Sequence, residues 1–405
     1  MSIAVIGGGP AGMMAAYAAA QNGHAVSLFE KNEKLDKKLY LTGKGRCNVT
    51  NTADRDAFFA NITRNPRFLY SAFSAFDNQD MIRLIEEAGV PLKQERGGRV
   101  FPASDKSSDI LSAMERLVRG AGVRVLLRTE VTGIAAQDGH VCGVTTQAGF
   151  LPFDAVVVAT GGVSYPSTGS TGDGYRFAEA LGHDVIAPTP SLIPFETVED
   201  WPNALTGLTL KNVTLTAEQD GRRTVSEPGE LLLTHFGVSG PLVLTLSTLL
   251  SGDPAGTRLF IDLKPALTRE QLDARLLRDL AGSGKKQLRT ALSGLLPAKL
   301  LDTVLSLAGI DPFMPASEFT KAQRAALTEI NKALPLTVRC ARPIEEAIVT
   351  RGGVSVRSVN ASTMGSRLVE GLYFAGEVLD VDAKTGGFNL QIAWSTGALA
   401  GQSIG

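Results

Sequence analysis

The first thirty residues alternate between apolar runs and a glycine-rich turn. An apolar run over residues 2–6 leads into the turn at residues 7–12, and an alanine-rich segment over residues 13–21 follows. A second apolar run over residues 25–29 ends in Glu30. Short, continuous apolar runs are typical of buried parallel strands, and the alanine-rich segment is typical of a helix. The pattern therefore predicts a strand–helix–strand unit at the start of the chain.

The next 150 residues continue this alternation. Residues 31–52 are polar and contain two glycines, which predicts a loop. Asp138-Gly139 lies between two runs of strand-forming residues and predicts a hairpin turn. The amphipathic segments predict helices over residues 67–89, 107–120 and 174–181, and the apolar runs predict strands over residues 123–127, 131–136, 141–146 and 154–159.

Three prolines within residues 188–194 mark a change of composition, where we expect the chain to cross into another domain. The chain from there to Asp262 is rich in Thr, Val and Leu, which predicts antiparallel strands. One helix is predicted to begin at Pro241, with Ser239 as its cap. Residues 267–334 predict helices broken by glycine and proline. The remaining predicted elements are strands over residues 336–340 and 371–377 and a helix over residues 390–400.

Composition excludes several classes of protein. With 20% charged and 44% apolar residues among 405, the chain is neither disordered nor collagen-like. Its net charge of −1 gives no overall attraction to nucleic acid or to an anionic membrane. Its most apolar window, residues 231–250, contains glycine, proline and histidine and is a poor membrane span. No signal peptide is visible, so we expect a soluble, cytoplasmic protein.

Cysteine and histidine are scarce. The three cysteines are widely spaced, and the four histidines form no HExxH motif. These spacings predict neither a disulfide framework nor a metal site.

The turn after the first strand has the spacing of a dinucleotide-binding motif. Gly7, Gly9 and Gly12 follow a strand and open a helix, and Glu30 ends the next strand. In this context the first glycine permits a tight turn, the second lets the backbone approach a pyrophosphate, and the third allows close packing. The start of the helix favours phosphate, and Glu30 is placed to accept hydrogen bonds from ribose hydroxyls.

Three features favour FAD over NAD as the dinucleotide. Strands and a hairpin are inserted before Ala159-Thr160-Gly161, as in flavoproteins of the two-dinucleotide type. The chain returns with residues 373–377, whose final acidic residue could reach a ribityl chain. The glycine turn at residues 385–390 then opens a helix whose start could stabilise negative charge on a reduced flavin. There is no second GxGxxG motif for a separate NAD(P)H domain.

Short glycine-containing motifs follow one another along the whole chain. They cover residues 7–12, 41–51, 97–102, 159–166, 168–174, 234–241, 350–354, 375–380 and 385–391. In this order they resemble the BaiN/RdsA-type FAD-dependent oxidoreductases, and the resemblance runs essentially from end to end.

The resemblance implies an α/β fold with three domains. A Rossmann-like FAD-binding domain of the two-dinucleotide type would comprise residues 1–188 and 343–405. A β-rich substrate domain, residues 189–263 and 335–342, would be inserted into it, and a helical domain, residues 264–334, would be inserted in turn. Members of this family reduce steroid or bile-acid enones, reduce a uridine of ribosomal RNA, or oxidise small aminoketones with oxygen. The resemblance therefore implies the cofactor more firmly than the substrate.

The loop after the second strand contains Arg46, Cys47 and Asn48, where disulfide reductases of similar fold place two cysteines. Cys47 has no neighbouring cysteine, so we expect it to pack near the flavin, with a flavin-contacting or redox-sensitive thiol as the alternative. Arg46 and Asn48 could bind the isoalloxazine edge or the phosphates. The predicted FAD-binding residues are Gly7, Gly9, Pro10, Ala11, Gly12, Glu30, Lys38, Gly45, Arg46, Cys47, Asn48, Val131, Thr160, Gly161, Gly376, Glu377, Gly387, Asn389 and Leu390.

His235 and Tyr165 are the candidate catalytic residues. Reduction of an enone needs a hydride at the β-carbon and a proton at the α-carbon, and either side chain could supply the proton. The alternative is that each fills a polar niche, with Tyr165 walling the site. Residues 264–299 hold eight basic and three acidic residues, which predicts a solvated face or a contact for anions such as RNA phosphates. This segment has no aromatic residue for base stacking, which disfavours RNA.

The sequence thus predicts an FAD-dependent oxidoreductase that uses NAD(P)H to reduce a conjugated C=C bond in a steroid-like or other small enone. The alternatives are reduction of uridine in rRNA, oxygen-dependent oxidation of an aminoketone, and a flavoprotein that binds FAD without turnover. The expected partner is a small molecule rather than RNA or a membrane, and the oligomeric state stays open.

Overall fold

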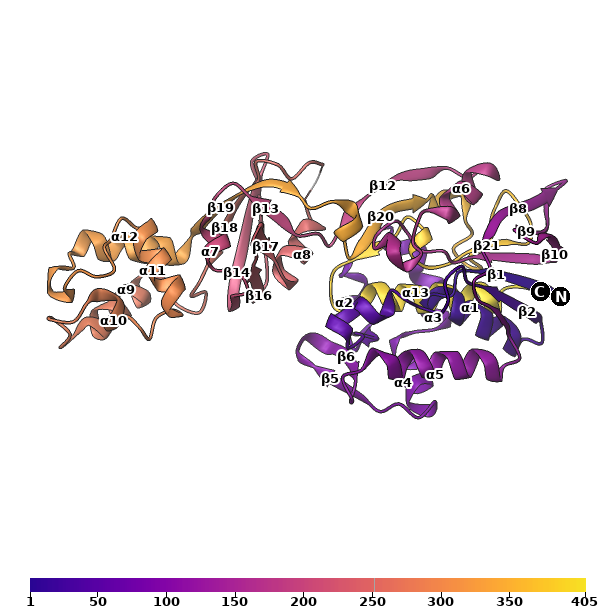
Figure 1. Cartoon of the computed structure of the whole chain (residues 1–405), viewed down its shortest axis with the longest axis horizontal. Coiled ribbons are helices and arrows are strands. Elements are labelled where there is room, and N and C mark those ends of the chain that lie inside the picture. Colours follow the sequence, from indigo (N-terminus) through magenta and orange to yellow (C-terminus); the bar gives the residue numbers. More distant parts are fainter. Residues whose placement is uncertain (251) are drawn as a thin grey trace. The chain divides into compact units, whose positions relative to one another are not determined.

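The chain is divided into two compact units (Figure 1). The computed structural model describes residues 1–250 and 252–405, with the backbone alone at residues 42 and 44. The first unit comprises Met1–Ser191 and Pro343–Gly405, and the second comprises Leu192–Arg342. The further predicted division of the second unit into a β-rich and a helical domain stays a prediction.

A parallel sheet of five strands forms the centre of the first unit. Its order is β21 (Leu372–Phe374), β11 (Ala155–Val158), β1 (Ser2–Ile6), β2 (Ala25–Phe29) and β7 (Arg124–Leu126). All four neighbouring pairs are parallel, and Ile6 lies between Val158 and Phe29 in register. The predicted Rossmann-like α/β fold is confirmed. Because the strands are parallel, the turn that follows β1 lies at the carboxyl edge of the sheet, where such folds bind ligands.

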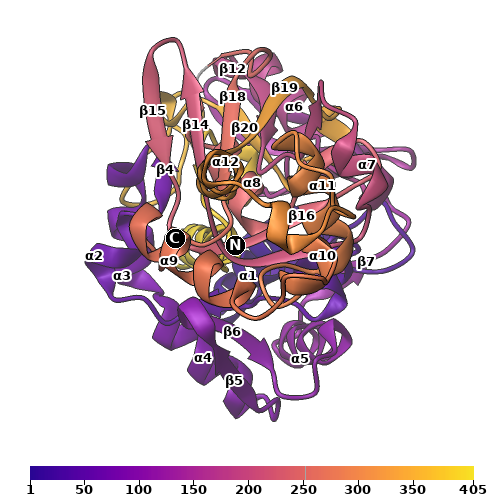
Figure 2. The ribbon, with the colours of Figure 1, turned by 90° about the vertical axis from the view of Figure 1, so that its left-hand side faces the viewer.

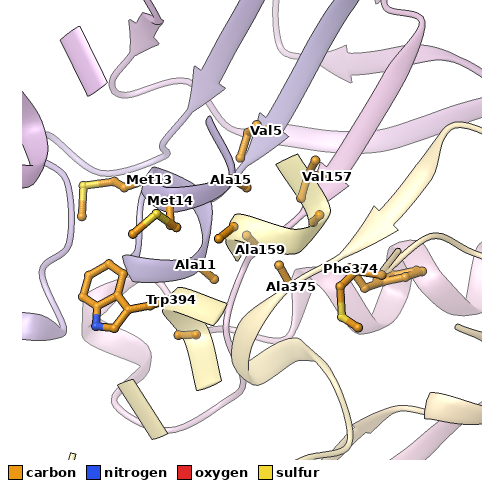
Figure 3. Packing of buried hydrophobic residues seen from close by; sticks show 14 of the residues in the cluster. Val5, Ala11, Met13, Met14, Ala15, Val157, Ala159, Phe374, Ala375 and Trp394 are labelled. Atoms are coloured by element: carbon orange, nitrogen blue, oxygen red, sulfur yellow. The ribbon is translucent and has the colours of Figure 1, made fainter. Parts of the chain in front are cut away.

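Two helices from opposite ends of the chain pack together in this unit. They are α1 (Pro10–Gln21) and α13 (Phe388–Gln402), indigo and yellow in Figure 1. A Cβ atom on Gly397 or Gly401 would lie 2.3 or 2.4 Å from a carbonyl oxygen of α1, so only glycine permits this approach. Figure 3 shows the small residues Ala11 and Ala15 of α1 in this core, together with Trp394 of α13.

The predicted helix over residues 67–89 is wrong in its continuity. The structure has a 3₁₀ helix, Pro66–Leu69, then α3 (Tyr70–Ala75) and α4 (Asn78–Glu87). Phe76 is extended, and Asp77 caps α4 by accepting hydrogen bonds from the amides of Gln79 and Asp80. Asp77 begins a second helix within a continuous amphipathic pattern. Hydrophobic periodicity alone therefore predicts one helix instead of two.

The predicted hairpin at Asp138-Gly139 is confirmed, with both residues at positive φ between β8 (Val131–Gln137) and β9 (His140–Thr146). The predicted loop over residues 31–52 contains a 3₁₀ helix, Leu39–Gly45, and a short strand. The other helices and strands of the unit are α2 (Arg55–Phe59), α5 (Ser107–Gly120), α6 (Asp173–Ala180), β3 (Thr50–Asn51), β4 (Ile62–Arg64), β5 (Leu92–Glu95), β6 (Arg99–Pro102), β10 (Gly149–Pro152), β12 (Val185–Ser191), β20 (Val349–Val354) and β22 (Asp382–Ala383).

The second unit contains a closed antiparallel sheet. The strand order is β15 (Arg222–Val225), β14 (Thr209–Gln219), β16 (Gly229–Leu233), β17 (Gly237–Ser239), β13 (Phe195–Thr197), β19 (Leu334–Ala341) and β18 (Arg258–Asp262). Because β18 also pairs with β14, the six strands from β14 to β18 close into a barrel. Two short helices, α7 (Trp201–Ala204) and α8 (Pro241–Ser247), accompany it.

The predicted cap of α8 by Ser239 is wrong. The helix begins at Pro241 as expected, but Ser239 belongs to β17, and Gly240 at φ +91° occupies the capping position without a side-chain hydrogen bond. A Cβ atom at Gly240 would lie 2.8 Å from the amide nitrogen of Leu232. The tight passage between strand and helix therefore requires glycine at this position.

Four further helices of the second unit are visible in Figure 2, namely α9 (Arg269–Leu280), α10 (Leu288–Ala291), α11 (Ala298–Leu307) and α12 (Lys321–Lys332). The breaks between them lie at the predicted glycine and proline positions. Thr268 and Thr320 begin α9 and α12, each with a glutamine three residues later that completes a capping box. Among the described residues, no helix combines the length and the apolar character needed to cross a membrane.

Candidate functional site

The three glycines after β1 have distinct surroundings. A Cβ atom on Gly7 would lie 2.5 Å from the carbonyl oxygen of Ala159, and one on Gly12 would lie 1.8 Å from that of Gly7. These two glycines hold β1, β11 and α1 together. Gly9 instead has no atom within 4 Å of such a Cβ position, and no side chain caps the start of α1. The turn thus offers open space beside unpaired helix N–H groups, a geometry suited to a phosphate.

Glu30 directly follows β2 beside this turn and is fixed by three donors. Its carboxylate accepts hydrogen bonds from the Gly8 amide at 2.9 Å, the Asn32 amide at 2.8 Å and the Asn32 side chain at 2.7 Å. The carboxylate is held against the glycine turn, and its contact with a nucleotide ribose stays a prediction.

Asp36 is a buried acid next to the same turn. The sequence did not indicate this residue as part of the site. Its amide donates to the Gly8 carbonyl oxygen at 2.9 Å, and its backbone is left-handed at φ +51°. Neither carboxyl oxygen has a hydrogen-bond partner, and the residue is 3% exposed. Burial raises the pKa of Asp36 to about 8, with a contribution from the negative charge of Glu30, against the lowering effect of the Leu39 amide and of Lys38. The acid is therefore protonated at neutral pH.

Lys38 and Glu377, both predicted to bind FAD, form an ion pair with each other. The Lys38 ammonium lies 2.7 Å from Oε2 of Glu377 and donates to the Ser164 hydroxyl at 2.7 Å. The other oxygen of Glu377 accepts from the Thr350 amide at 2.8 Å, and the Thr350 hydroxyl accepts from the amides of Val163 and Ser164. The structure thus gathers four chain segments at this edge of the sheet. Ser164 and Thr350 were not predicted, although both lie in glycine-containing motifs.

Gly161, Thr160 and Gly376 lie at the ends of β11 and β21. Gly376 is at φ +77°, and its amide donates to the Thr396 hydroxyl of α13 at 2.9 Å. Gly161 is also left-handed, and the Thr160 hydroxyl is buried without a partner. Val131, the first residue of β8, is buried in the hydrophobic core.

In the loop over residues 45–48, ion pairs fix the side chain of Arg46, and two residues have a left-handed backbone. Arg46 lies 2.8 Å from Glu95, 3.1 Å from Asp105 and over the ring of Phe101. Gly45 and Cys47 are both left-handed, and Cys47 is fully buried. The Asn48 amide oxygen is buried without a partner. A bound group with an N–H donor fits that oxygen, whereas a contact of Arg46 with the cofactor stays a prediction.

The start of α13 lies against β3, which follows this loop. A Cβ atom on Gly387 would lie 2.3 Å from the Thr50 carbonyl oxygen, and the Asn51 side chain donates to Gly386 at 2.9 Å. The Asn389 side chain donates to the Ala383 carbonyl oxygen at 2.8 Å and accepts from its amide at 3.0 Å, while Leu390 packs on the core. The side chain of Asn389 thus shapes the turn before the helix.

The two candidate proton donors have different environments. Tyr165 lies in the first unit with a left-handed backbone at φ +50°, unusual for a bulky residue and often found at functional sites. Burial and the negative charge of Glu346 raise the pKa of the Tyr165 hydroxyl. His235 lies in the second unit, exposed in the turn between β16 and β17, with its ring edge-on to Phe236 at 5.0 Å.

A family model described as the HI0933-like protein Rossmann domain matches residues 1–403. The chain belongs to this family. It is therefore an FAD-dependent flavoprotein and an oxidoreductase. The open space at Gly9, the uncapped start of α1 and the unpartnered Asn48 oxygen all fit such a cofactor.

Named relatives of this family match the chain over nearly its whole length. It is 32% identical to a 3-dehydro-bile acid delta(4,6)-reductase of Clostridium scindens, covering 99% of this chain and 98% of the relative. It is also 32% identical to a ribosomal RNA dihydrouridine synthase of Haemophilus influenzae and 30% identical to that of Escherichia coli, each covering 99% of this chain and 97% of the relative.

Solved structures support the same fold. The chain is similar to a 3-ketosteroid-delta4-(5alpha)-dehydrogenase of Rhodococcus jostii, with a TM-score of 0.56, 17% identity, and coverage of 99% of this chain and 96% of the other. It is similar to a 3-ketosteroid delta1-dehydrogenase of Sterolibacterium denitrificans, with a TM-score of 0.52, 13% identity and 98% coverage of both chains. At these identities the likeness shows the fold alone.

Proposed function

We propose that the protein reduces a C=C bond conjugated to a carbonyl group in a small, steroid-like molecule, with NAD(P)H as the electron donor. The names of its full-length relatives describe reduction of a bile acid at delta(4,6) positions and formation of dihydrouridine. Both describe a C=C bond reduced in a ring that carries a carbonyl group. This shared chemistry supports the proposed reaction type. The proposed class of substrate rests on the charged residues of this chain.

The pairing of basic residues is the observation that favours a small molecule over RNA. RNA-binding proteins use lysine and arginine to neutralise phosphates, and the RNA then releases the counterions of those phosphates. In the helical part of the second unit, residues 264–334, five of the eleven basic side chains instead pair with carboxylates. The pairs are Arg269–Glu329, Arg275–Asp279, Arg289–Asp302, Arg324–Asp273 and Lys332–Asp262.

The chain's own residues would position the cofactor and supply the proton. FAD, when bound, supplies the hydride for the β-carbon of the substrate. Gly9 and the start of α1 would receive its phosphates, and Glu30 its ribose. The Tyr165 hydroxyl, whose pKa is raised by burial and by the negative charge of Glu346, would donate a proton to the α-carbon. His235 is the alternative donor.

Anaerobic stopped-flow absorbance of the FAD-loaded protein tests this proposal. We expect NADH or NADPH to bleach the flavin band and a 3-oxo steroid with a conjugated double bond to restore it. The saturated steroid is the matched control and should restore nothing. If neither nicotinamide bleaches the band, and an aminoketone does so with release of hydrogen peroxide under oxygen, the proposal is wrong.

Reduction of uridine in ribosomal RNA is the second candidate, because two of the full-length relatives carry that name. Its test is the same reduced protein mixed with unmodified ribosomal RNA in place of the steroid. Reoxidation by the RNA, with dihydrouridine in the product and no reoxidation by any enone, would replace the first proposal by the second.

A further inference from the structure

Asp382 is a fully buried carboxylate that gathers donors from three strands. Its Oδ2 accepts from the Ser191 hydroxyl at 2.5 Å and from two nitrogens of Arg351, each at 3.2 Å. Its Oδ1 accepts from the Thr63 hydroxyl at 2.8 Å. Its exposed fraction is 0%. A buried carboxylate is tolerated only when its oxygens are satisfied in this way, so loss of one donor is costly.

Two of these donors lie on the two connections to the second unit. Ser191 is the last residue of β12 and directly precedes Leu192, where the second unit begins. Arg351 lies on β20, the strand that follows the return of the chain at Pro343. The two strands are antiparallel partners, with Ser191 opposite Val349. One carboxylate thus holds the outgoing and the returning strand.

The strand that carries Asp382, β22, is separated from the start of α13 by the four residues 384–387. Ala383, the next residue, exchanges two hydrogen bonds with the side chain of Asn389 in the first turn of that helix. The same region is braced by Gly387 against Thr50. Displacement of Asp382 would therefore be transmitted through Ala383 and Asn389 to the first turn of α13.

We infer that Asp382 is a positioning residue that couples the two connecting strands to the flavin-facing start of α13. The inference rests on the proposed contact between this helix start and bound FAD. A helix start lowers the energy of nearby negative charge, so its distance from the flavin ring influences the stability of the reduced cofactor. A change in either connecting strand would then alter the redox potential of the flavin without touching it.

Asp380 offers a matched control two residues away. It is also buried, and its carboxylate pairs with Arg64 and accepts from Asn65 at 3.1 Å. These donors lie on β4 and just after it, not on either connecting strand. Asp380→Asn therefore removes the same charge from the same segment while the Ser191 and Arg351 contacts remain.

The first test is amide hydrogen exchange of the full chain with and without FAD. For Asp382→Asn we expect about tenfold faster exchange in residues 185–191, 349–354 and 383–390. Asp380→Asn should accelerate exchange around residues 62–65 and leave the connecting strands as in the native chain. Ser191→Ala and Arg351→Lys are milder variants, which should show the same pattern as Asp382→Asn even if that variant does not fold.

The second test is the midpoint potential of bound FAD, measured without any substrate. We expect Asp382→Asn and Arg351→Lys to shift the two-electron potential to more negative values by about 30 mV, which corresponds to a tenfold change in the equilibrium. If exchange increases in the connecting strands but neither the helix start nor the potential changes, the coupling does not exist. If exchange increases at the helix start and only the potential stays constant, the proposed contact of this helix with the flavin is at fault.

Discussion

The ammonium group of Lys38 lies 2.7 Å from a carboxylate oxygen of Glu377, 339 positions further along the chain. Both side chains are about one-fifth exposed, and each also bonds Ser164. The pair joins the loop after β2 to the end of β21. Two segments that are both predicted to bind FAD are thereby fixed to each other by a pair of charges.

Lys38→Met and Glu377→Gln should each raise the Kd for FAD about tenfold or more, because each leaves the opposite charge half-buried without its partner. In the double variant the loss of stability should be smaller than the sum of the single losses by about 1–3 kcal/mol. Fluorescence titration with FAD and urea unfolding measure both effects. Lys37→Met is the matched control, since Lys37 pairs with the half-exposed Glu33, and it should bind FAD normally.

Gly9→Ala and Gly12→Ala should fail in different ways. The Gly12 variant places a methyl group 1.8 Å from the Gly7 carbonyl oxygen, so we expect a strongly destabilised apoprotein. Gly9 has open space and φ −81°, a value that any residue adopts, so its variant should fold with an unchanged melting temperature but lose FAD affinity. Thermal unfolding without FAD, followed by FAD titration, separates the two. Equal FAD affinity in Gly9→Ala would exclude a phosphate at this position.

Asp36 should make the native chain less stable as the pH rises. Its folded-state pKa of about 8 lies above the ordinary 3.8, so the unfolded chain releases a proton that the folded chain keeps. The free energy of unfolding should therefore fall between about pH 4 and pH 8, by at most about 1.4 kcal/mol per pH unit, and then level off.

Asp36→Asn should remove this slope and be more stable than the native chain at about pH 7, since Asp36 is ionised in the unfolded chain and must take up a proton on folding, whereas the amide need not. Urea unfolding at several pH values measures the slope. Asp220→Asn is the control, because Asp220 has the same left-handed backbone but is exposed, and it should keep the native slope. An unchanged slope in Asp36→Asn would assign the pH dependence to another group.

His183 should have the opposite effect on stability, which it lowers as the pH falls. Its ring nitrogens lie 2.8 and 2.9 Å from the hydroxyls of Ser358 and Ser366, and burial lowers its pKa. The unfolded chain therefore takes up a proton that the folded chain refuses, and stability is complete above about pH 6.5 and falls as the pH drops below it.

His183→Gln should lose about 1–3 kcal/mol near neutral pH through its disturbed hydrogen bonds, and should show a smaller further loss near pH 5 than the native chain. Chemical unfolding at both pH values measures this. His140→Gln serves for comparison because His140 is largely exposed beside Glu370. The idea fails if both variants keep the native dependence on acid.

Tyr165→Phe should slow reduction of the enone about 100-fold or more, because the hydroxyl proposed to protonate the α-carbon is removed. Reduction of the bound flavin by NAD(P)H and the FAD content should stay unchanged. Stopped-flow measurement of the two half-reactions distinguishes these steps. Tyr373→Phe is the control, since burial raises the pKa of that tyrosine too, and it should retain the rate. An unaffected Tyr165→Phe would direct attention to His235→Gln.

The sequence predicted best those features that depend on neighbouring residues. The turn from Gly7 to Gly12 and the hairpin at Asp138-Gly139 follow from local backbone requirements, and both are found. The helix over residues 67–89 was wrong because the capping role of Asp77 was hidden in a continuous amphipathic pattern. The cap at Ser239 was wrong because a close approach of Gly240 to β16 decides the geometry.

Long-range contacts of the site could not be read from the chain. The pairing of Lys38 with Glu377, and of Asp382 with Ser191, depends on how the strands are ordered in the sheet rather than on sequence spacing. Asp36 gave no signal, since aspartate is common in exposed loops, whereas in the structure it is buried and its amide donates to the Gly8 carbonyl oxygen. The candidate residues were therefore found singly, while their partners required the fold.

The close packing of α1 against α13 has a consequence for biosynthesis. Residues of α1 leave the ribosome early, but the glycines of α13 that fit against them are translated after the whole second unit. Until then the alanine face of α1 lacks its cover, and the nascent chain presents apolar surface to chaperones. We therefore expect insertion of the flavin to be a late event in maturation, because a nascent chain arrested before Phe388 would lack the segment of α13 that is predicted to bind FAD.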